Sequence, residues 1–170
     1  MLDAGGRRRK LAAAATTLAA CALAATFSAV GQGATSIAER IRAAEISAPG
    51  IPMNPDLYAS EITYQHGNGP AHTIPRDAFL SRIGKEQSAF AAFVSGDAPK
   101  LSAFTEGTRD IVAVTERKGS LPNGTQIDIS TSIAFTVADG RIKKIVLNSS
   151  PELGPQFAEW FRAQGDGRRN

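Results

Sequence analysis

The start of the chain pairs a basic cluster with a long uncharged run. Four basic residues at positions 7–10 precede residues 11–30, which are rich in alanine and carry no charge. Small residues follow, up to Gly33. Basic, apolar and small-residue segments in this order are typical of a secretory signal peptide. We therefore predict that residues 1–33 are a signal peptide and that residues 34–170 form a folded domain that is exported, periplasmic or secreted.

Two alternatives concern the same segment. The uncharged run is just long enough to cross a bilayer, so a retained membrane anchor is the first, although alanine and threonine outnumber leucine. The second is a lipid anchor, because Leu18 to Cys21 matches the lipobox of bacterial lipoproteins, in which the cysteine thiol takes a lipid. Against it, residues 22–30 stay apolar, whereas a lipoprotein tether is usually polar. We expect membrane contact only if Cys21 is lipidated or the signal is retained.

Helical spacing of apolar residues recurs in the rest of the chain. Ile37, Ile41 and Ala44 fall on one stripe of the first such segment. A serine followed three positions later by glutamate forms a capping box at its start. The predicted helices lie at residues 36–46, 75–94 and 154–164, with a short turn or helix at 54–58.

Alternation of apolar and polar residues predicts strands elsewhere. Ile62, Tyr64 and His66 share one face of a strand at residues 61–66. Four more strands are predicted at residues 101–106, 110–117, 125–137 and 141–148, joined by turns that contain glycine. The longest has one apolar and one polar face, which is typical of an antiparallel sheet covered on one side. Helices on one face of a curved antiparallel sheet give an α+β fold.

Three stretches resemble a known superfamily. They are PDLYASEITYQHGNG at 55–69, IPRDAFLSRI at 74–83 and AFTVADGRIKKIVL at 134–147. With the order of the elements, they make the chain resemble the nuclear-transport-factor-2-like superfamily, in particular its SnoaL-like and ketosteroid-isomerase-like members. The resemblance implies a cone-shaped α+β domain, with a strongly bent antiparallel sheet wrapped around N-terminal helices, a pocket at the open end, and a homodimer. It implies no single reaction, because members include isomerases, cyclases, dehydratases and domains that only bind.

Charge and cysteine counts exclude several classes of partner. The chain has 19 basic and 16 acidic residues, but residues 34–170 carry 15 of each. A nucleic-acid surface needs a clustered basic excess, so we expect no nucleic-acid partner. Cys21 is the only cysteine, which excludes an intramolecular disulfide.

The sequence contains no motif for a metal or a cofactor. His66 and His72 lack a third ligand, so we expect no metal site. No phosphate-binding motif is present, so we expect no cofactor.

His66 is the candidate for catalysis. The resemblance implies a proton-moving carboxylate near the end of this strand in isomerase-like members, where this chain has His66. An imidazole titrates near neutrality and can serve as a general base; the alternative is an inert histidine hydrogen-bonded at a strand end. The isomerases also need a proton-donating acid on a later strand. Residues 130–133 offer none there, and Asp128 fits solvent or an interface better.

The predicted pocket is mostly apolar. Alternation places these side chains on its concave side: Ile62, Tyr64, His66, Ile129, Thr131, Ile133 and Phe135. An apolar lining with few polar groups is typical of a small-molecule site. We therefore predict that the domain binds a small apolar molecule, oriented by His66 and Tyr64, without transforming it. An isomerase, cyclase or dehydratase that uses His66 is the alternative, and an interaction domain with a vestigial pocket is a third. We expect the homodimer to form through the polar face of the sheet.

Overall fold

The structure is a computed structural model, and it describes residues 35–166. The predicted signal peptide, with Cys21, lies outside these residues, so export, signal cleavage and lipidation stay predictions. Among the helices of residues 35–166, none is long and apolar enough to span a membrane.

The predicted helices are confirmed, with ends that differ by one or two residues. They are α1 (Ile37–Ser47), the 3-10 helix η1 (Pro55–Leu57), α2 (Arg76–Phe93) and α3 (Gly154–Asp166). The capping box also forms at the start of α1. The backbone N–H of Ser36 donates to Oε2 of Glu39 at 2.7 Å, and the N–H of Glu39 donates to Oγ of Ser36 at 3.1 Å. These two bonds satisfy donors that have no partner within the helix.

Seven strands of the described chain form one mixed sheet. They are β1 (Tyr58–His66), β2 (His72–Pro75), β3 (Ser95–Gly96), β4 (Lys100–Glu106), β5 (Asp110–Ser120), β6 (Gln126–Ala138) and β7 (Arg141–Ser150). The order is β2-β1-β7-β6-β5-β3, and β4 also pairs with β5. The α+β fold with a strongly curved sheet is confirmed. The sheet is not antiparallel throughout, however, because β1 and β7 run parallel while the other pairs are antiparallel.

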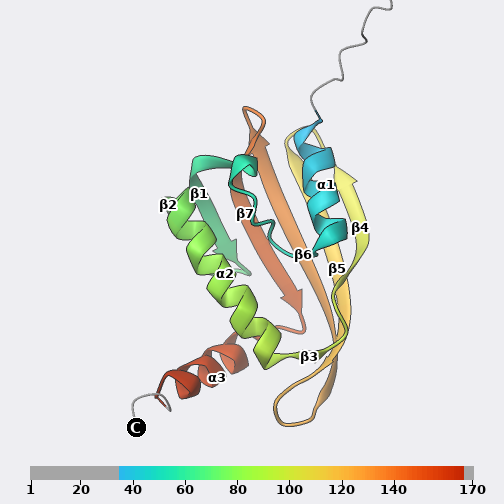
Figure 1. Cartoon of the computed structure of the whole chain (residues 1–170), viewed down its shortest axis with the longest axis vertical. Helices are drawn as coiled ribbons and strands as arrows, with labels where there is room; N and C mark the ends of the chain where they lie inside the picture. The colour runs from blue at the N-terminus through green and yellow to red at the C-terminus, as the bar shows by residue number, and fades with distance from the viewer. Residues whose placement is uncertain (1–34, 167–170) are drawn as a thin grey trace, which may run out of the picture. The chain divides into compact units, whose positions relative to one another are not determined.

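The helices α1 and α2 lie on the same face of the sheet (Figure 1). On β6, Ile129, Ile133 and Phe135 are buried, and the residues that alternate with them face the opposite side. The main core fills the space between the helices and the sheet. Its fully buried large side chains are Ile41, Leu57, Tyr58, Ile62, Phe79, Ile83, Ile133, Phe135, Ile142 and Ile145. Each such side chain contributes about 1.5–3 kcal/mol when it leaves water, so this layer stabilises most of the domain.

A second, smaller core joins α3 to the end of α2. Phe93, Val94, Leu121, Ile129 and Leu153 are buried in it. Aromatic rings of α2 and α3 pack against this cluster and are themselves only half-buried. The short C-terminal helix is therefore held by aromatic contacts rather than by strand pairing.

The strand β3 pairs with β5 where two glycines, Gly96 and Gly119, lie opposite each other. Gly96 has φ of +129°, and a Cβ there would lie 2.6 Å from the carbonyl oxygen of Lys118. A Cβ on Gly119 would lie 2.5 Å from Cγ1 of Val94 and 2.7 Å from the carbonyl oxygen of Ser95. Side chains essentially never approach so closely, so both strands need glycine at this pair of positions.

We expect Gly119→Ala to lower the free energy of unfolding by about 1–3 kcal/mol, since the added methyl group meets backbone that cannot move aside freely. Urea unfolding of the full chain measures the change. Gly154→Ala is the matched control, because its Cβ would meet Oε1 of Glu152 at an ordinary 3.7 Å. Equal stability of the two variants would contradict the close approach of β3 and β5 at these glycines.

Candidate functional site

The structure places most of the predicted lining inside the two cores. Ile62, Tyr64, Ile133 and Phe135 belong to the main core and Ile129 to the smaller one. Thr131 is half-buried, with its Oγ1 3.3 Å from Oγ of Ser149. His66 is exposed. The five core residues are packed among the other buried side chains of these cores.

His66 ends β1 at a tight turn. Its Cα is opposite Leu147 of β7, and its carbonyl oxygen accepts a hydrogen bond from the N–H of Gly69 at 3.0 Å. The imidazole is exposed, and so it is not desolvated like the groups deeper in the sheet. Its role as a general base stays a prediction.

Tyr64 packs between a ring and a cation. Its ring centroid lies 5.7 Å from that of Phe79, and the Arg82 guanidinium lies 5.9 Å from the Tyr64 ring. Burial, reinforced by the Glu86 carboxylate and opposed by Arg82, raises the pKa of Tyr64 to about 12. The hydroxyl therefore stays protonated and remains a hydrogen-bond donor at neutral pH.

Glu45 is a buried acid that the sequence analysis did not single out. The side chain is fully buried on the inner face of α1. Its Oε2 accepts a hydrogen bond from the N–H of Gly50 at 3.0 Å, whereas Oε1 has no hydrogen-bond partner among the described residues. Burial raises the pKa of Glu45 from its ordinary value of 4.5 to about 7, and the bond from Gly50 lowers it in part. A large share of Glu45 is therefore a neutral acid at physiological pH.

The sequence did carry a signal for Glu45. Ile37, Ile41 and Glu45 are spaced by four residues, so they lie along one face of α1. The stripe predicted from the sequence comprised Ile37, Ile41 and Ala44 and did not include Glu45. An acid that falls on the apolar stripe of an amphipathic helix is the pattern that would have found it.

A strap of seven residues, 48–54, crosses from α1 to η1 and passes between α1 and α2 (Figure 1). Three side chains bond to its backbone. Besides the bond from Gly50 to Glu45, the Tyr58 hydroxyl donates to the carbonyl oxygen of Pro52 at 2.5 Å, and Nε2 of Gln87 donates to the carbonyl oxygen of Ile51 at 3.1 Å. The strap also inserts Ile51 into the main core. It therefore covers the interior beside Glu45.

Tyr58 is the polar neighbour of Glu45 in this interior. It is fully buried, and its ring centroid lies 5.7 Å from that of Phe79. Burial raises the pKa of Tyr58, and the Glu45 carboxylate raises it further. The Tyr58 hydroxyl therefore stays protonated and keeps donating to the strap.

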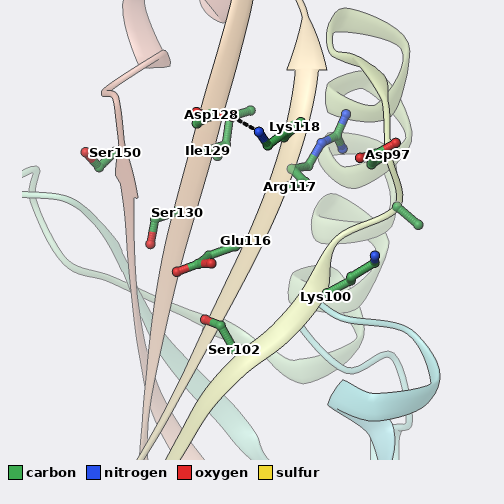
Figure 2. Close-up of a pocket in the computed structure, with 11 residues that line it drawn as sticks. Asp97, Lys100, Ser102, Glu116, Arg117, Lys118, Asp128, Ile129, Ser130 and Ser150 are labelled. Carbon is green, nitrogen blue, oxygen red and sulfur yellow. Dashed lines mark ion pairs between the residues drawn. The ribbon is translucent and has the colours of Figure 1, made fainter.

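A polar groove of about 540 Å³ lies on the opposite face of the sheet (Figure 2). Glu116 and Ser130 face each other across β5 and β6, and Ser130 faces Ser150 of β7. The ion pair between Lys118 and Asp128 is exposed and 4.0 Å long, and such pairs contribute little. The lining carries acids and bases in equal number: Asp97, Glu116, Asp128, Lys100, Arg117 and Lys118. This is the polar face through which the homodimer is expected, and the homodimer stays a prediction.

No metal centre is indicated in the described part of the chain, where no three His, Cys, Asp or Glu side chains gather as ligands would. Of the predicted ligand-binding residues, Ile129 alone borders the polar groove. The interior around Glu45 is thus a place where a titratable group, an unpartnered polar atom and apolar core residues meet.

Solved structures with this fold exist, although no protein-family profile and no curated protein match the chain. One is a protein from Mesorhizobium loti, provisionally named a SnoaL-like polyketide cyclase [carbohydrate phosphatase], with a TM-score of 0.50 and 11% identity over 65% of this chain and 94% of that one. Another is a nuclear-transport-factor-2-like protein of unknown function from Cytophaga hutchinsonii, with a TM-score of 0.50 and 12% identity over 68% of this chain and 98% of that one. At such identities the likeness shows the fold alone.

Proposed function

We propose that this domain binds a small, mostly apolar molecule between the sheet and the layer of α1 and α2, and that Glu45 orients it through a hydrogen bond. The observation that carries the proposal is the buried Oε1 of Glu45, which has no partner among the described residues. Leaving such an atom unpaired costs about 1–3 kcal/mol. Unsatisfied buried groups are rare and frequently mark functional sites. Because residues 1–33 have the pattern of a signal peptide, we also propose that the domain is exported to the periplasm or secreted.

The surroundings of Glu45 define the class of ligand. The main core on which α1 packs is apolar, and Ile41, Ile51 and Phe79 are among its buried residues. A neutral carboxyl group donates one hydrogen bond, so the ligand needs an acceptor such as a carbonyl oxygen. An apolar ring system that carries one ketone satisfies both requirements.

Access to Glu45 would pass the strap. In the described part of the chain, only three side-chain hydrogen bonds, to Glu45, Tyr58 and Gln87, hold the backbone of the strap. Met53, near the end of the strap that leads to η1, is 44% exposed. Movement of the strap would withdraw Ile51 from the core and leave an apolar space for the ligand. Glu45, Tyr58 and the sheet would then line that space from fixed positions.

Proton transfer is the second candidate function, as in an isomerase, cyclase or dehydratase. A pKa of about 7 favours it, because an acid–base catalyst works best when its pKa lies near the operating pH. Glu45 would then supply the interior acid that the sequence analysis did not find, and it would replace His66 as the group that moves the proton. A protonated carboxyl in an apolar site can also stabilise a developing oxyanion.

The binding test uses the purified full chain and cyclic ketones of one to four rings. Bound ketone should raise the melting temperature, because a ligand that binds only the folded state stabilises it. Glu45→Gln keeps a donor and should bind nearly as well as the unchanged chain. Glu45→Leu removes the donor and should weaken binding about tenfold. Glu61→Gln, at an exposed position of β1, is the control. Equal binding by all variants would contradict the role of Glu45.

A separate measurement distinguishes a binder from an enzyme. Exchange of the ketone α-protons in D₂O, followed by NMR, reports proton transfer without a known substrate. If the domain is an enzyme, Glu45→Gln should slow the exchange on the order of a hundredfold or more, whereas His66→Ala should not. The opposite result would assign the chemistry to His66, and no exchange by the unchanged chain would leave binding as the function.

A further inference from the structure

A small hollow lies where α3 meets the end of α2 and the turn between β5 and β6. Its volume is about 220 Å³, and it is separate from both the interior and the polar groove. Phe93 and Trp160 form an aromatic wall, with ring centroids 5.5 Å apart. The rest of the lining comes from Leu121, Pro122, Asn123, Gln156 and Glu159.

The walls of this hollow are held in place by the smaller core. Phe93 and Leu121 are buried there, and Trp160 stacks on Phe157 at a centroid distance of 6.2 Å and an angle of 22°. Because these side chains are already packed, a ligand would not need to order them first. Preorganised walls of this kind favour binding.

The turn at residues 121–125 is preformed as well. The N–H of Leu121 donates to the carbonyl oxygen of Thr125 at 2.9 Å, and the N–H of Gly124 donates to that of Leu121 at 2.8 Å. The N–H of Thr125 donates to Oδ1 of Asn123 at 3.0 Å. The Asn123 carboxamide can still offer a ligand its NH₂ group and the second lone pair of its oxygen.

The rim of the hollow carries three planar polar groups. Asn123 and Gln156 are carboxamides, Glu159 is a carboxylate, and all three are exposed. Glu159 is the only charged residue of the lining, so an anionic ligand is disfavoured. Two carboxamides and a carboxylate together donate and accept several hydrogen bonds, which suits a ligand with several hydroxyl groups.

We propose that this hollow binds one neutral sugar ring. A pyranose is amphipathic: its C–H groups can pack against Trp160 while its hydroxyl groups bond to Asn123, Gln156 and Glu159. A volume of about 220 Å³ is on the scale of a single ring rather than of an oligosaccharide. A quaternary ammonium ion would use the indole and the carboxylate but would leave both carboxamides without a role.

The chain offers a direct reporter for the test, because Trp160 is its only tryptophan. The intrinsic fluorescence of the full chain is titrated with glucose, galactose and N-acetylglucosamine, and separately with choline. We expect a saturable change with at least one sugar and a dissociation constant on the order of millimolar. Choline should give no saturable change at the same concentrations.

Variants at the rim test the assignment of the site. Glu159→Ala and Gln156→Ala alter exposed side chains, so both should fold, and each should weaken sugar binding at least fivefold. Glu152→Ala, exposed but outside the hollow, is the matched control and should bind as the unchanged chain does.

Three results would overturn the sugar site: saturation by choline but not by a sugar, no saturable response to any of the three sugars, or sugar binding that survives both rim substitutions. Glu45→Leu should leave the sugar titration unchanged. Failure of the sugar site and failure of the interior site are therefore distinguishable.

Discussion

The domain should lose stability as the pH rises from about 5 to 8, and Glu45→Gln should remove most of that loss. Burial raises the pKa of Glu45 from 4.5 to about 7 in the folded state. Between these values the folded protein binds more protons at this site than the unfolded chain does, so the free energy of unfolding falls with pH. The contribution is complete below pH 4.5 and is lost as the pH passes 7. At 1.36 kcal/mol for each pKa unit, the loss is about 3 kcal/mol.

Urea unfolding of the full chain at pH 5 and pH 8 measures this effect. Glu45→Gln should match the unchanged chain at pH 5, because an amide keeps the shape and can still accept from Gly50, and it should exceed it at pH 8. Glu61→Gln should follow the unchanged chain at both values, since this side chain is exposed. Parallel profiles for Glu45→Gln and the unchanged chain would show that Glu45 is not buried in the folded state.

Three other groups with a shifted pKa act outside this pH window. A hydrogen bond from Lys143 is the main cause that lowers the pKa of Asp139 below its ordinary 3.8, so Asp139 stabilises the fold more as the pH rises from the acid range. The raised pKa values of Tyr58 and Tyr64 keep both phenols neutral from pH 5 to pH 8. A loss of stability between pH 5 and 8 that depends on Glu45 therefore reports the interior acid.

Local patterns in the sequence predict the elements of this fold well, because apolar periodicity records which face each element buries. The apolar stripe of Ile37 and Ile41 predicted α1, and the alternation from Ile127 to Val137 predicted β6. The pairing of β1 with β7 could not be found in this way, since alternation fixes the faces of a strand but not its neighbour or direction. The short strands β2 and β3 have too few residues to show a period, and their partners hold them in place.

The candidate site was harder to predict than the fold, for a physical reason. Alternation showed that Tyr64, Ile133 and Phe135 share the concave face, but whether that face borders a cavity depends on what the other layer inserts. Here α2 inserts Phe79 and the strap inserts Ile51, and both belong to the main core. Contacts between segments far apart in the chain, such as Gln87 with Ile51, leave no local signal in the sequence.

Phe79→Ala should lower the free energy of unfolding by about 3–5 kcal/mol, which is among the largest effects expected of a single substitution. The Phe79 side chain is fully buried, and its ring lies 5.7 Å from the rings of both Tyr58 and Tyr64. Removing the ring leaves a cavity between α2 and β1 and withdraws the support of two tyrosines at once. Since small domains are stable by about 5–15 kcal/mol, the variant would approach the limit of folding.

A milder substitution and an exposed aromatic residue complete this test. Phe79→Leu keeps most of the buried volume and should cost about 1.5 kcal/mol, so it remains measurable by urea unfolding if the alanine variant does not fold. Phe161→Ala, at a side chain that is 53% exposed, should change the free energy of unfolding by about 0.5 kcal/mol or less.

Because Phe79 supports Tyr58, which bonds to the strap at Pro52, Phe79→Leu should also make the strap easier to open. Faster proteolytic cleavage between residues 48 and 54 in Phe79→Leu than in Phe161→Ala would confirm this link, and equal cleavage would contradict it.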